Sequence, residues 1–522
     1  MLIPDIASVD TKPYDMRYLI DGEVRTWSGA HIDVLSPIED EHGKRTVLGR
    51  APKLSKEEAL SALAAAKRAW SNGRGEWPTM RVQDRIRCVE RFTKGMLAVR
   101  EDIVRLLMLE IGKSRKDSES EVDRTMVYIK DTIEALKELD RASGRFVMQD
   151  GFIGQTRRSP LGVALCMGPF NYPLNETFTT LIPALIMGNA IVSKLPKYGT
   201  LLHAPMFQAM AESFPKGVIN IVQGDGATVV GPMMESGDVD VLAFIGSSRV
   251  ANILKKQHPR PNRLRCILGL EAKNPAFVLE DADLDVAIPE CVSGALSFNG
   301  QRCTGLKLIF VHETRAREFA ERFAAAVSKL KAGAPWEPGV QITPLPEEGK
   351  SPWLQGYIDD AVQKGAKLIA GGKAQGTLFI PGVLTGVTSA MRIFHEEQFG
   401  PLVPIASYTD ERELDAFMQA SPYGQQVAIF GKSPAAIARL VDALANQVSR
   451  INLNTQCRRG PDTFPFTGRK DSAEATLSVH DALRAFSIRT VVATSASDAN
   501  KAIVSDIVTT RRSAFLSTDY VF

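Results

Sequence analysis

The 522-residue sequence lacks three features that mark particular classes of protein. No apolar run approaches the about eighteen residues of a membrane-spanning helix, and the N-terminus, MLIPDIASVDTKPYD, has neither the basic start nor the apolar core of a secretory signal. Nor is there a surplus of one charge, because 63 basic residues stand against 60 acidic ones. We therefore expect a cytoplasmic protein with no membrane and no nucleic-acid partner, since nucleic-acid binders usually concentrate basic residues.

The sequence is also poor in cysteine, with six in all and no CxxC pair. Scattered cysteines in a chain of this size are typical of a reduced, intracellular protein and exclude a disulfide framework. Their spacing does not resemble that of metal ligands either, so we predict no metal site. The cysteines stand at positions 88, 166, 266, 291, 303 and 457.

Hydrophobic periodicity predicts a protein of two α/β units. Between Ser55 and about Leu139, apolar residues recur at three- and four-residue spacing, which is typical of amphipathic helices. Further on, short apolar runs such as GVALCMGPF, NAIVSKLP and VDVLAFIGS alternate with helical stretches, and a second such series begins near Asn274. Strands that alternate with helices favour parallel sheets with crossovers on their faces.

Two segments lie outside these units. The stretch GRFVMQDGFIGQTRRSPLG is typical of a β-hairpin, and IRTVVAT, residues 488–494, is a strand with little sequence left to pair with it. A sheet shared between subunits would use such segments. A disordered tail is the alternative for the residues after Ser495, and the sequence leaves both open.

The strongest chemical signal is FNGQRCT, residues 298–304. Cys303 lies in a glycine-containing loop beside Arg302, where positive charge favours a thiolate. A buried, inert cysteine is the ordinary alternative, and we assign the other five cysteines to it. Four further motifs accompany Cys303. They are GPFNYP (168–173), IVSK (191–194) with a lysine at 197, FIGSS (244–248) and EEQFGP (396–401).

In this order and spacing, the motifs resemble the aldehyde dehydrogenase superfamily, from about Ser28 to Thr494. Within it the chain is most similar to the non-phosphorylating, NADP-dependent glyceraldehyde-3-phosphate dehydrogenases. The resemblance implies an α/β fold with a Rossmann-type cofactor domain, an α/β catalytic domain and a small β oligomerisation arm. The implied ranges are 1–142 and 162–276 for the cofactor domain, 277–484 for the catalytic domain, and 143–161 with 485–522 for the arm and C-terminal tail.

The resemblance also implies a reaction. The Cys303 thiolate attacks an aldehyde carbonyl, and Asn171 together with the Cys303 backbone N–H stabilises the oxyanion. Hydride then passes to a nicotinamide and leaves a thioester, which water hydrolyses after a carboxylate removes its proton. Sulfur suits this role because it is both a good nucleophile at neutral pH and a good leaving group.

Six residues carry over as cofactor contacts. They are Lys194, Lys197, Gly246, Ser247, Glu397 and Phe399. NAD-preferring relatives commonly place glutamate at the position of Lys197, where it accepts from the ribose 2′-hydroxyl. A lysine attracts a 2′-phosphate instead, so we predict NADP, with NAD as the second possibility. A solvated surface lysine is the alternative interpretation.

The general base departs from the family pattern. The family's base lies four positions before the lysine of a Glu-Leu-Gly-Gly-Lys stretch, and here the corresponding stretch ends at Lys273 with Gly269 at the base position. A glutamate follows two residues later, at Glu271, about 7 Å further along an extended chain. We predict that Glu271 supplies the carboxylate. Another base, or a different acyl acceptor, are the alternatives.

Four residues from separate segments predict a pocket for a phosphorylated aldehyde. Arg124 lies on a helix in EVDRT, Tyr172 follows Asn171, and Arg302 precedes the nucleophile. Arg459 lies in CRRGPDTFPF, which resembles the subgroup's pattern. Arginines bind phosphate through bidentate contacts, whereas a surface salt bridge is the alternative for each of them.

We therefore predict NADP-dependent oxidation of glyceraldehyde 3-phosphate to 3-phosphoglycerate without phosphorylation. The alternative enzyme is an NAD(P)-dependent dehydrogenase of another small aldehyde or semialdehyde. A cysteine thioesterase would need no cofactor motifs, and the missing carboxylate at Gly269 makes a non-catalytic relative the third alternative. By resemblance we expect a homotetramer or homodimer, joined through the predicted hairpin and the strand at 488–494.

Overall fold

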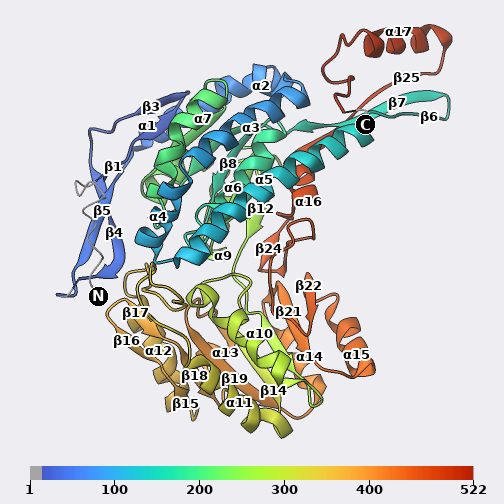
Figure 1. The fold of residues 1–522 in the computed structure, drawn as a ribbon. Helices are drawn as coiled ribbons and strands as arrows, with labels where there is room; N and C mark the ends of the chain where they lie inside the picture. Colours follow the sequence, from blue (N-terminus) through green and yellow to red (C-terminus); the bar gives the residue numbers. More distant parts are fainter. Residues whose placement is uncertain (1–13, 41, 521–522) are drawn as a thin grey trace.

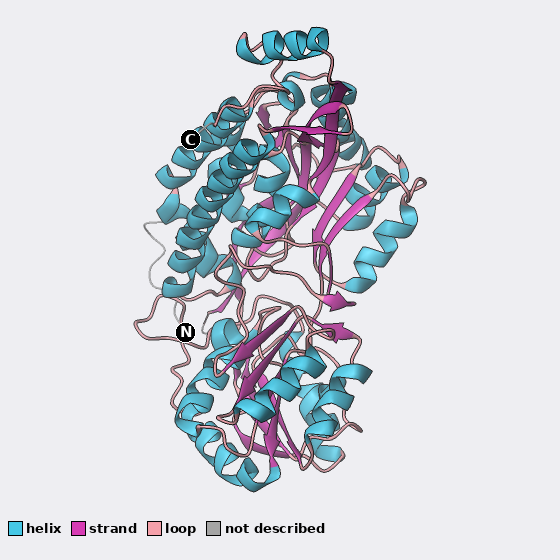
Figure 2. Cartoon of the chain, turned by 90° about the vertical axis from the view of Figure 1, so that its right-hand side faces the viewer, coloured by secondary structure: helices cyan, strands magenta, loops and turns pink. Residues whose placement is uncertain are grey.

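The structure, a computed structural model, describes residues 14–40 and 42–520. Two open sheets, each covered by helices on both faces, form two lobes, and a long arm of strands projects from the first lobe (Figures 1 and 2). The predicted alternation of strand and helix is therefore present in both halves of the chain.

The larger sheet has eight strands within the described residues, and the five at its centre run parallel. In spatial order they are β24 (Ala473–Glu474), β12 (Arg265–Gly269), β11 (Val241–Ile245), β8 (Val163–Met167), β9 (Ala190–Lys194), β10 (Ile219–Val222), β2 (Tyr18–Ile20) and β3 (Glu23–Arg25). Parallel strands end at one common edge, which is where ligands bind in open α/β sheets. The loops that follow β8, β9, β11 and β12 all begin at this edge.

Helices cover both faces of this sheet, so β8 is buried on both sides and its sequence, VALCM, is a continuous apolar run. One face packs against α1 (Lys56–Trp70), α8 (Gly226–Glu235) and α9 (Ser248–Gln257). The other packs against α3 (Val82–Ala98), α4 (Arg100–Ile111), α5 (Arg115–Ser143), α6 (Asn175–Ile186) and α7 (Phe207–Ser213). Every residue of α6 is buried, because α3 and α5 cover the side that faces away from the sheet.

The second sheet has seven strands in the described part of the chain, all parallel except the first edge strand. They are β15 (Lys367–Ala370), β18 (Gly382–Thr385), β19 (Leu402–Tyr408), β14 (Leu308–His312), β13 (Pro275–Val278), β21 (Gln426–Phe430) and β22 (Arg450–Leu453). Its helices are α10 (Leu284–Leu296), α11 (Glu313–Val327), α12 (Lys350–Gln363), α14 (Glu411–Ala420) and α15 (Pro434–Leu444).

The arm is a three-stranded antiparallel sheet in which β25 (Ser487–Ser495) pairs with β7 (Phe152–Pro160), and β7 pairs with β6 (Phe146–Gln149). The predicted hairpin and the late strand are thus both formed, and they pair with each other. The chain continues as α17 (Asp498–Thr509), an element that the sequence analysis did not predict (Figure 1).

The other named elements are short or peripheral. They are β1 (Tyr14–Asp15), β4 (His31–Glu39), β5 (Arg45–Pro52), α2 (Glu76–Thr79), α13 (Arg392–His395), β16 (Lys373–Gln375), β17 (Leu378–Ile380), β20 (Tyr423–Gly424), β23 (Arg469–Lys470), α16 (Val479–Ala485) and the 3-10 turns at Ser71–Gly73, Leu201–Met206 and Ser297–Gly300. Among the described residues, no helix combines the length and apolar character needed to cross a membrane.

The domain ranges stay a prediction, but the strands can be placed within them. Six strands of the second sheet lie wholly inside 277–484, and the seventh, β13, starts two residues before that range. The eight-stranded sheet takes its edge strand β24 from the same range. The predicted catalytic range therefore contributes a short strand to the sheet of the predicted cofactor domain, which apolar periodicity alone does not reveal.

Candidate active site

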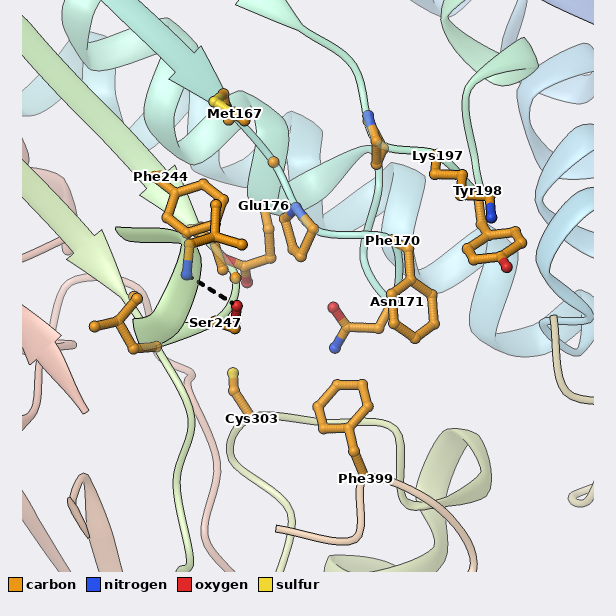
Figure 3. A pocket seen from close by; sticks show the side chains of 18 of the residues that line it. Met167, Phe170, Asn171, Glu176, Lys197, Tyr198, Phe244, Ser247, Cys303 and Phe399 are labelled. Atoms are coloured by element: carbon orange, nitrogen blue, oxygen red, sulfur yellow. Dashed lines mark hydrogen bonds between the residues drawn. The ribbon is translucent and has the colours of Figure 1, made fainter. Parts of the chain in front are cut away.

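A cavity of about 530 Å³ lies at the common edge of the parallel strands, between the two lobes. Nine of the predicted site residues line it, together with Gly269. The nine are Asn171, Lys194, Lys197, Gly246, Ser247, Glu271, Cys303, Glu397 and Phe399. The structure therefore brings together residues that lie up to 228 positions apart (399 − 171 = 228), and Figure 3 shows several of them around one space.

The loop before the nucleophile is held in an unusual backbone conformation. Phe298, Asn299 and Gly300 have φ values of 47°, 56° and 68°, a left-handed run that most side chains disfavour. Asn299 stabilises the run because its Oδ1 accepts from Thr343 N (2.9 Å) and its Nδ2 donates to Thr343 Oγ1 (3.0 Å). Gly300 is required for space as well, since a Cβ there would lie 2.6 Å from the Gly400 carbonyl oxygen.

Cys303 and Asn171 face each other across the cavity (Figure 3). The Asn171 Nδ2 donates to the Gln301 carbonyl (2.7 Å), and the Cys303 carbonyl accepts from Asn274 Nδ2 (2.8 Å). Burial, followed by the charge of the Glu176 carboxylate, raises the pKa of the Cys303 thiol to about 11. The side-chain amide of Asn171 therefore stands where an oxyanion formed on a Cys303-bound carbon would need a donor.

A buried ion pair fixes the loop that carries Asn171. Lys113 and Glu121, both with fully buried side chains, pair with each other, and Lys113 Nζ also donates to the Asn171 carbonyl (2.8 Å). Glu121 Oε1 accepts from the backbone N–H groups of Leu174 (3.0 Å) and Asn175 (3.1 Å) at the start of α6. These contacts satisfy donors that the helix start leaves free.

The start of α9 provides the donors expected for a phosphate group. Ser247 caps the helix, with its Oγ accepting from Val250 N (3.3 Å), and Gly246 precedes it at the end of β11. Glu271, however, already uses this helix start, because its Oε2 accepts from Ser248 N (2.8 Å). The carboxylate that we predicted as the general base is therefore held at the anion-binding end of α9.

Two lysines fit the adenosine part of a dinucleotide phosphate. Burial lowers the pKa of Lys194 to about 8. The exposed Lys197 ammonium lies 5.2 Å from the Tyr198 ring centroid and, within residues 14–40 and 42–520, forms no ion pair with a carboxylate. An unneutralised lysine at the rim is suited to a 2′-phosphate, so the residues present fit NADP.

Glu397 and Phe399 are held by buried lysines that the sequence analysis did not single out. Lys307 donates to Glu397 Oε1 (2.8 Å) and to the Arg302 carbonyl (2.6 Å), joining the nucleophile loop to the loop of Glu397. Lys273 Nζ donates to the carbonyls of residues 393 and 396 and to the side chain of residue 398. Phe399 has a φ of 36° and packs edge-on against Phe170, with ring centroids 5.8 Å apart.

The four residues of the predicted phosphate clamp do not line this cavity. Arg124 pairs with Asp462 (2.9 Å), and Arg459 is buried between Asp462 (3.0 Å) and Glu176. Arg302 points to the other side of its loop, where it donates to the Cys457 carbonyl (3.2 Å). These arginines are absent from the cavity lining because each has found a partner that the sequence could not indicate.

Tyr172, the fourth predicted substrate contact, also lies outside the cavity lining. Its ring receives the Lys113 ammonium at 3.7 Å and packs edge-on against Phe298 at 6.0 Å. Burial raises the pKa of its hydroxyl to about 12. Tyr172 is therefore placed to support the nucleophile loop from behind.

Sequence analysis missed Glu176, a charged cavity residue. It stands inside the largely apolar stretch of α6, NETFTTLIPALI, and such a charge within a buried helix is the signal that was available. The structure shows no group of three or more potential metal ligands among its described residues.

Comparisons with known proteins agree with the fold. The aldehyde dehydrogenase family model matches residues 26–492. The NADP-dependent glyceraldehyde-3-phosphate dehydrogenase of Streptococcus equinus is 32% identical over 484 residues, which is 91% of this chain and 97% of that relative. The 3-sulfolactaldehyde dehydrogenase of Pseudomonas putida is 30% identical over 433 residues, 81% of this chain and 86% of the relative.

A solved structure gives the same result. The NADP-dependent glyceraldehyde-3-phosphate dehydrogenase from Bacillus halodurans C-125, complexed with NADP, superposes with a TM-score of 0.86 at 32% identity. The match covers 93% of this chain and 100% of that one. The predicted resemblance and fold class are therefore confirmed.

Proposed function

The chain belongs to the aldehyde dehydrogenase family, and from this premise we propose that it oxidises a small aldehyde with NADP through a thioester on Cys303. The observation that carries the proposal is the single cavity in which Cys303, Asn171 and the cofactor motifs meet. When bound, the nicotinamide cofactor supplies a hydride acceptor.

The chain's own residues supply the remaining chemistry. The Cys303 sulfur attacks the aldehyde carbon, and the Asn171 amide with the Cys303 backbone N–H donates to the oxyanion, each such donor commonly contributing about 3 kcal/mol. Loss of hydride from the tetrahedral carbon leaves the thioester. Burial raises the pKa of the thiol to about 11, so the reactive thiolate depends on the positive charges of Lys307 and Arg459, which lower that pKa.

NADP is the proposed cofactor. Lys197 is an exposed residue of the cavity lining that pairs with no carboxylate in the described part of the chain, and the Streptococcus and Bacillus relatives are NADP-dependent enzymes. Lys194, Ser247, Glu397 and the start of α9 complete the contacts that we propose for it.

We propose glyceraldehyde 3-phosphate as the aldehyde, with 3-phosphoglycerate as the product. The relatives named above support this substrate. A different small aldehyde is the second candidate, and a specific observation favours it. The buried guanidinium of Arg459 is held by Glu176 and Asp462, so binding a phosphate would require these pairs to open.

A substrate panel at fixed NADP tests both candidates through the absorbance of the reduced cofactor. Glyceraldehyde 3-phosphate should have the highest kcat/KM, compared with succinate semialdehyde and betaine aldehyde. Cys303→Ser should abolish oxidation and still bind NADP. Substantial turnover by this variant would overturn the mechanism.

The oligomeric state is also a proposal. The arm exposes a set of large apolar side chains on its strands, which are Val147, Met148, Phe152, Ile488 and Val491. Exposed apolar sheet faces favour association, so we propose a homodimer or homotetramer that buries this arm.

A further inference from the structure

Hydrolysis of a thioester on Cys303 needs a base. At the position where the family carries this base, the chain has Gly269 and therefore no carboxylate. Gly269 ends β12 at the cavity, where it offers only its backbone. Water is a poor nucleophile without a group that accepts its proton, and such assistance commonly contributes about 10²–10⁴-fold in rate. Another side chain in the cavity has to provide it.

Four carboxylates line the cavity, and each of them has a hydrogen-bond or ion-pair partner. Glu271 accepts from the first N–H of α9 (2.8 Å), and Glu397 pairs with Lys307 (2.8 Å). Glu347 pairs with Lys350 at 3.3 Å. None of these three is the carboxylate whose charge acts most strongly on the nucleophile.

The fourth carboxylate, Glu176, is that group. It is 6% exposed, it lines the same cavity as Cys303, and Figure 3 shows its side chain directed into the space between α6 and the thiol. Among the charged side chains that act on Cys303, Glu176 raises the pKa of the thiol most. The effect of one charge on another falls with distance, so this order agrees with the place of Glu176 beside Cys303 in the cavity.

The partners of Glu176 orient its carboxylate. Oε2 is paired with Arg459, and the nearest donor to Oε1 is the Asn175 amide at 3.3 Å. Arg459 also binds Asp462, which in turn binds Arg124, so two carboxylates share two guanidinium groups. The ion pair with Arg459 holds Oε2, and Oε1 is the oxygen left to meet a water molecule in the cavity.

We propose that Glu176 is the catalytic base that activates water for hydrolysis of the Cys303 thioester. An O–H bond of the water breaks and its proton passes to Glu176, while the water oxygen forms a bond to the acyl carbon. The carbon–sulfur bond then breaks, sulfur leaves as the thiolate, and the carboxylic acid is released. The inference rests on the proposed function, because it requires an acyl group on Cys303.

An aryl ester isolates this step from oxidation. p-Nitrophenyl acetate can acylate a thiolate without cofactor, giving a burst of nitrophenolate followed by a steady rate limited by hydrolysis. For Glu176→Gln we expect the burst to remain and the steady rate to fall by about 100-fold or more. Mass spectrometry should then find the acetyl group on the FNGQRCT peptide.

Two other Glu→Gln variants, which remove the same charge elsewhere in the cavity, serve as comparisons. Glu347→Gln, another cavity carboxylate with one cationic partner, should hydrolyse the acyl group at close to the wild-type rate. A loss confined to Glu271→Gln would overturn the inference and assign the base to residue 271. A wild-type rate in Glu176→Gln would overturn it as well.

Two further measurements separate a base from a structural support. Hydroxylamine, which is a nucleophile that needs no base, should release the acyl group from Glu176→Gln as fast as from the wild type. Gly269→Glu in the Glu176→Gln background should restore hydrolysis, since a Cβ at 269 would meet no atom closer than 3.4 Å. Failure of both rescues would overturn the assignment.

The experiment also distinguishes a failure of the proposed function from a failure of the role proposed for Glu176. If the wild-type protein never carries the acetyl group on Cys303, the proposed function fails together with its nucleophile. If the group forms there and disappears equally fast from every variant, only the role of Glu176 fails. Should Glu176→Gln not fold, Glu176→Asp keeps the charge beside Arg459 but withdraws the carboxylate, and its acyl group should persist longer than in the wild type.

Discussion

Replacing Glu121 by glutamine leaves the Lys113 ammonium buried without its counter-ion. Both side chains are 0% exposed, and breaking a buried pair from one side typically costs about 3–5 kcal/mol of unfolding free energy. Glutamine still offers an oxygen to the N–H groups of Leu174 and Asn175, so the loss should reflect the charge alone.

A similar loss of unfolding free energy follows from the titration of Lys113. Burial lowers the pKa of Lys113, and without Glu121 the lysine can fold neutral. Releasing the proton at pH 7 from a group with an unfolded pKa of about 10.4 costs about 5 kcal/mol, which sets an upper limit on the penalty. The unfolded state then binds one more proton than the folded state, so the stability of the variant should rise by about 1.4 kcal/mol per pH unit up to the unfolded pKa.

Urea unfolding followed by circular dichroism at several pH values between 7 and 10 measures this dependence. The difference between wild type and Glu121→Gln should shrink steadily as the pH rises. Lys113→Met combined with Glu121→Gln should recover at least about 2 kcal/mol, because no charge is then left unpaired. A loss below about 1 kcal/mol, or a difference independent of pH, would refute the reasoning.

Three other predictions concern the cavity. Alkylation of Cys303 by iodoacetamide without cofactor should accelerate about tenfold per pH unit between pH 7 and 10, because burial raises the pKa of the thiol to about 11. Glu176→Gln should react faster than the wild type at pH 8, since the charge of Glu176 raises that pKa. A rate that levels off below pH 9 would contradict this. Lys197→Glu should weaken NADP binding about tenfold or more and leave NAD binding largely intact, as measured by fluorescence titration, since a charge-assisted bond to the 2′-phosphate is lost. Glu271→Gln should bind NADP more tightly, because a carboxylate no longer competes with the pyrophosphate for the start of α9; weaker binding in calorimetry would show that Glu271 supports the cofactor instead.

Where sequence reasoning succeeded, the determining contacts are local. The spacing of apolar residues predicts the alternation of strand and helix, and parallel strands in one sheet must end at a common edge. Residues at or just after the ends of such strands, such as Asn171, Lys194 and Gly246, therefore lie close together at this edge for any course of the connecting loops. The loop of Cys303 is equally local, because its left-handed run depends on neighbouring residues and one glycine.

The charges behave differently, because a buried ionised group is stable only beside an opposite charge, and its partner can come from any part of the chain. Arg459 pairs with Glu176, 283 positions away, and Arg124 pairs with Asp462, 338 positions away. Glu271 also has a partner that the sequence did not indicate, because its carboxylate accepts from the backbone N–H of Ser248 at the start of α9. The amino-acid order by itself determined the two sheets and the edge at which the parallel strands of each end, and it singled out Cys303 as the predicted nucleophile. Only the tertiary structure decided which carboxylate faces that nucleophile, since desolvation energies depend on neighbours in space and not on neighbours in sequence.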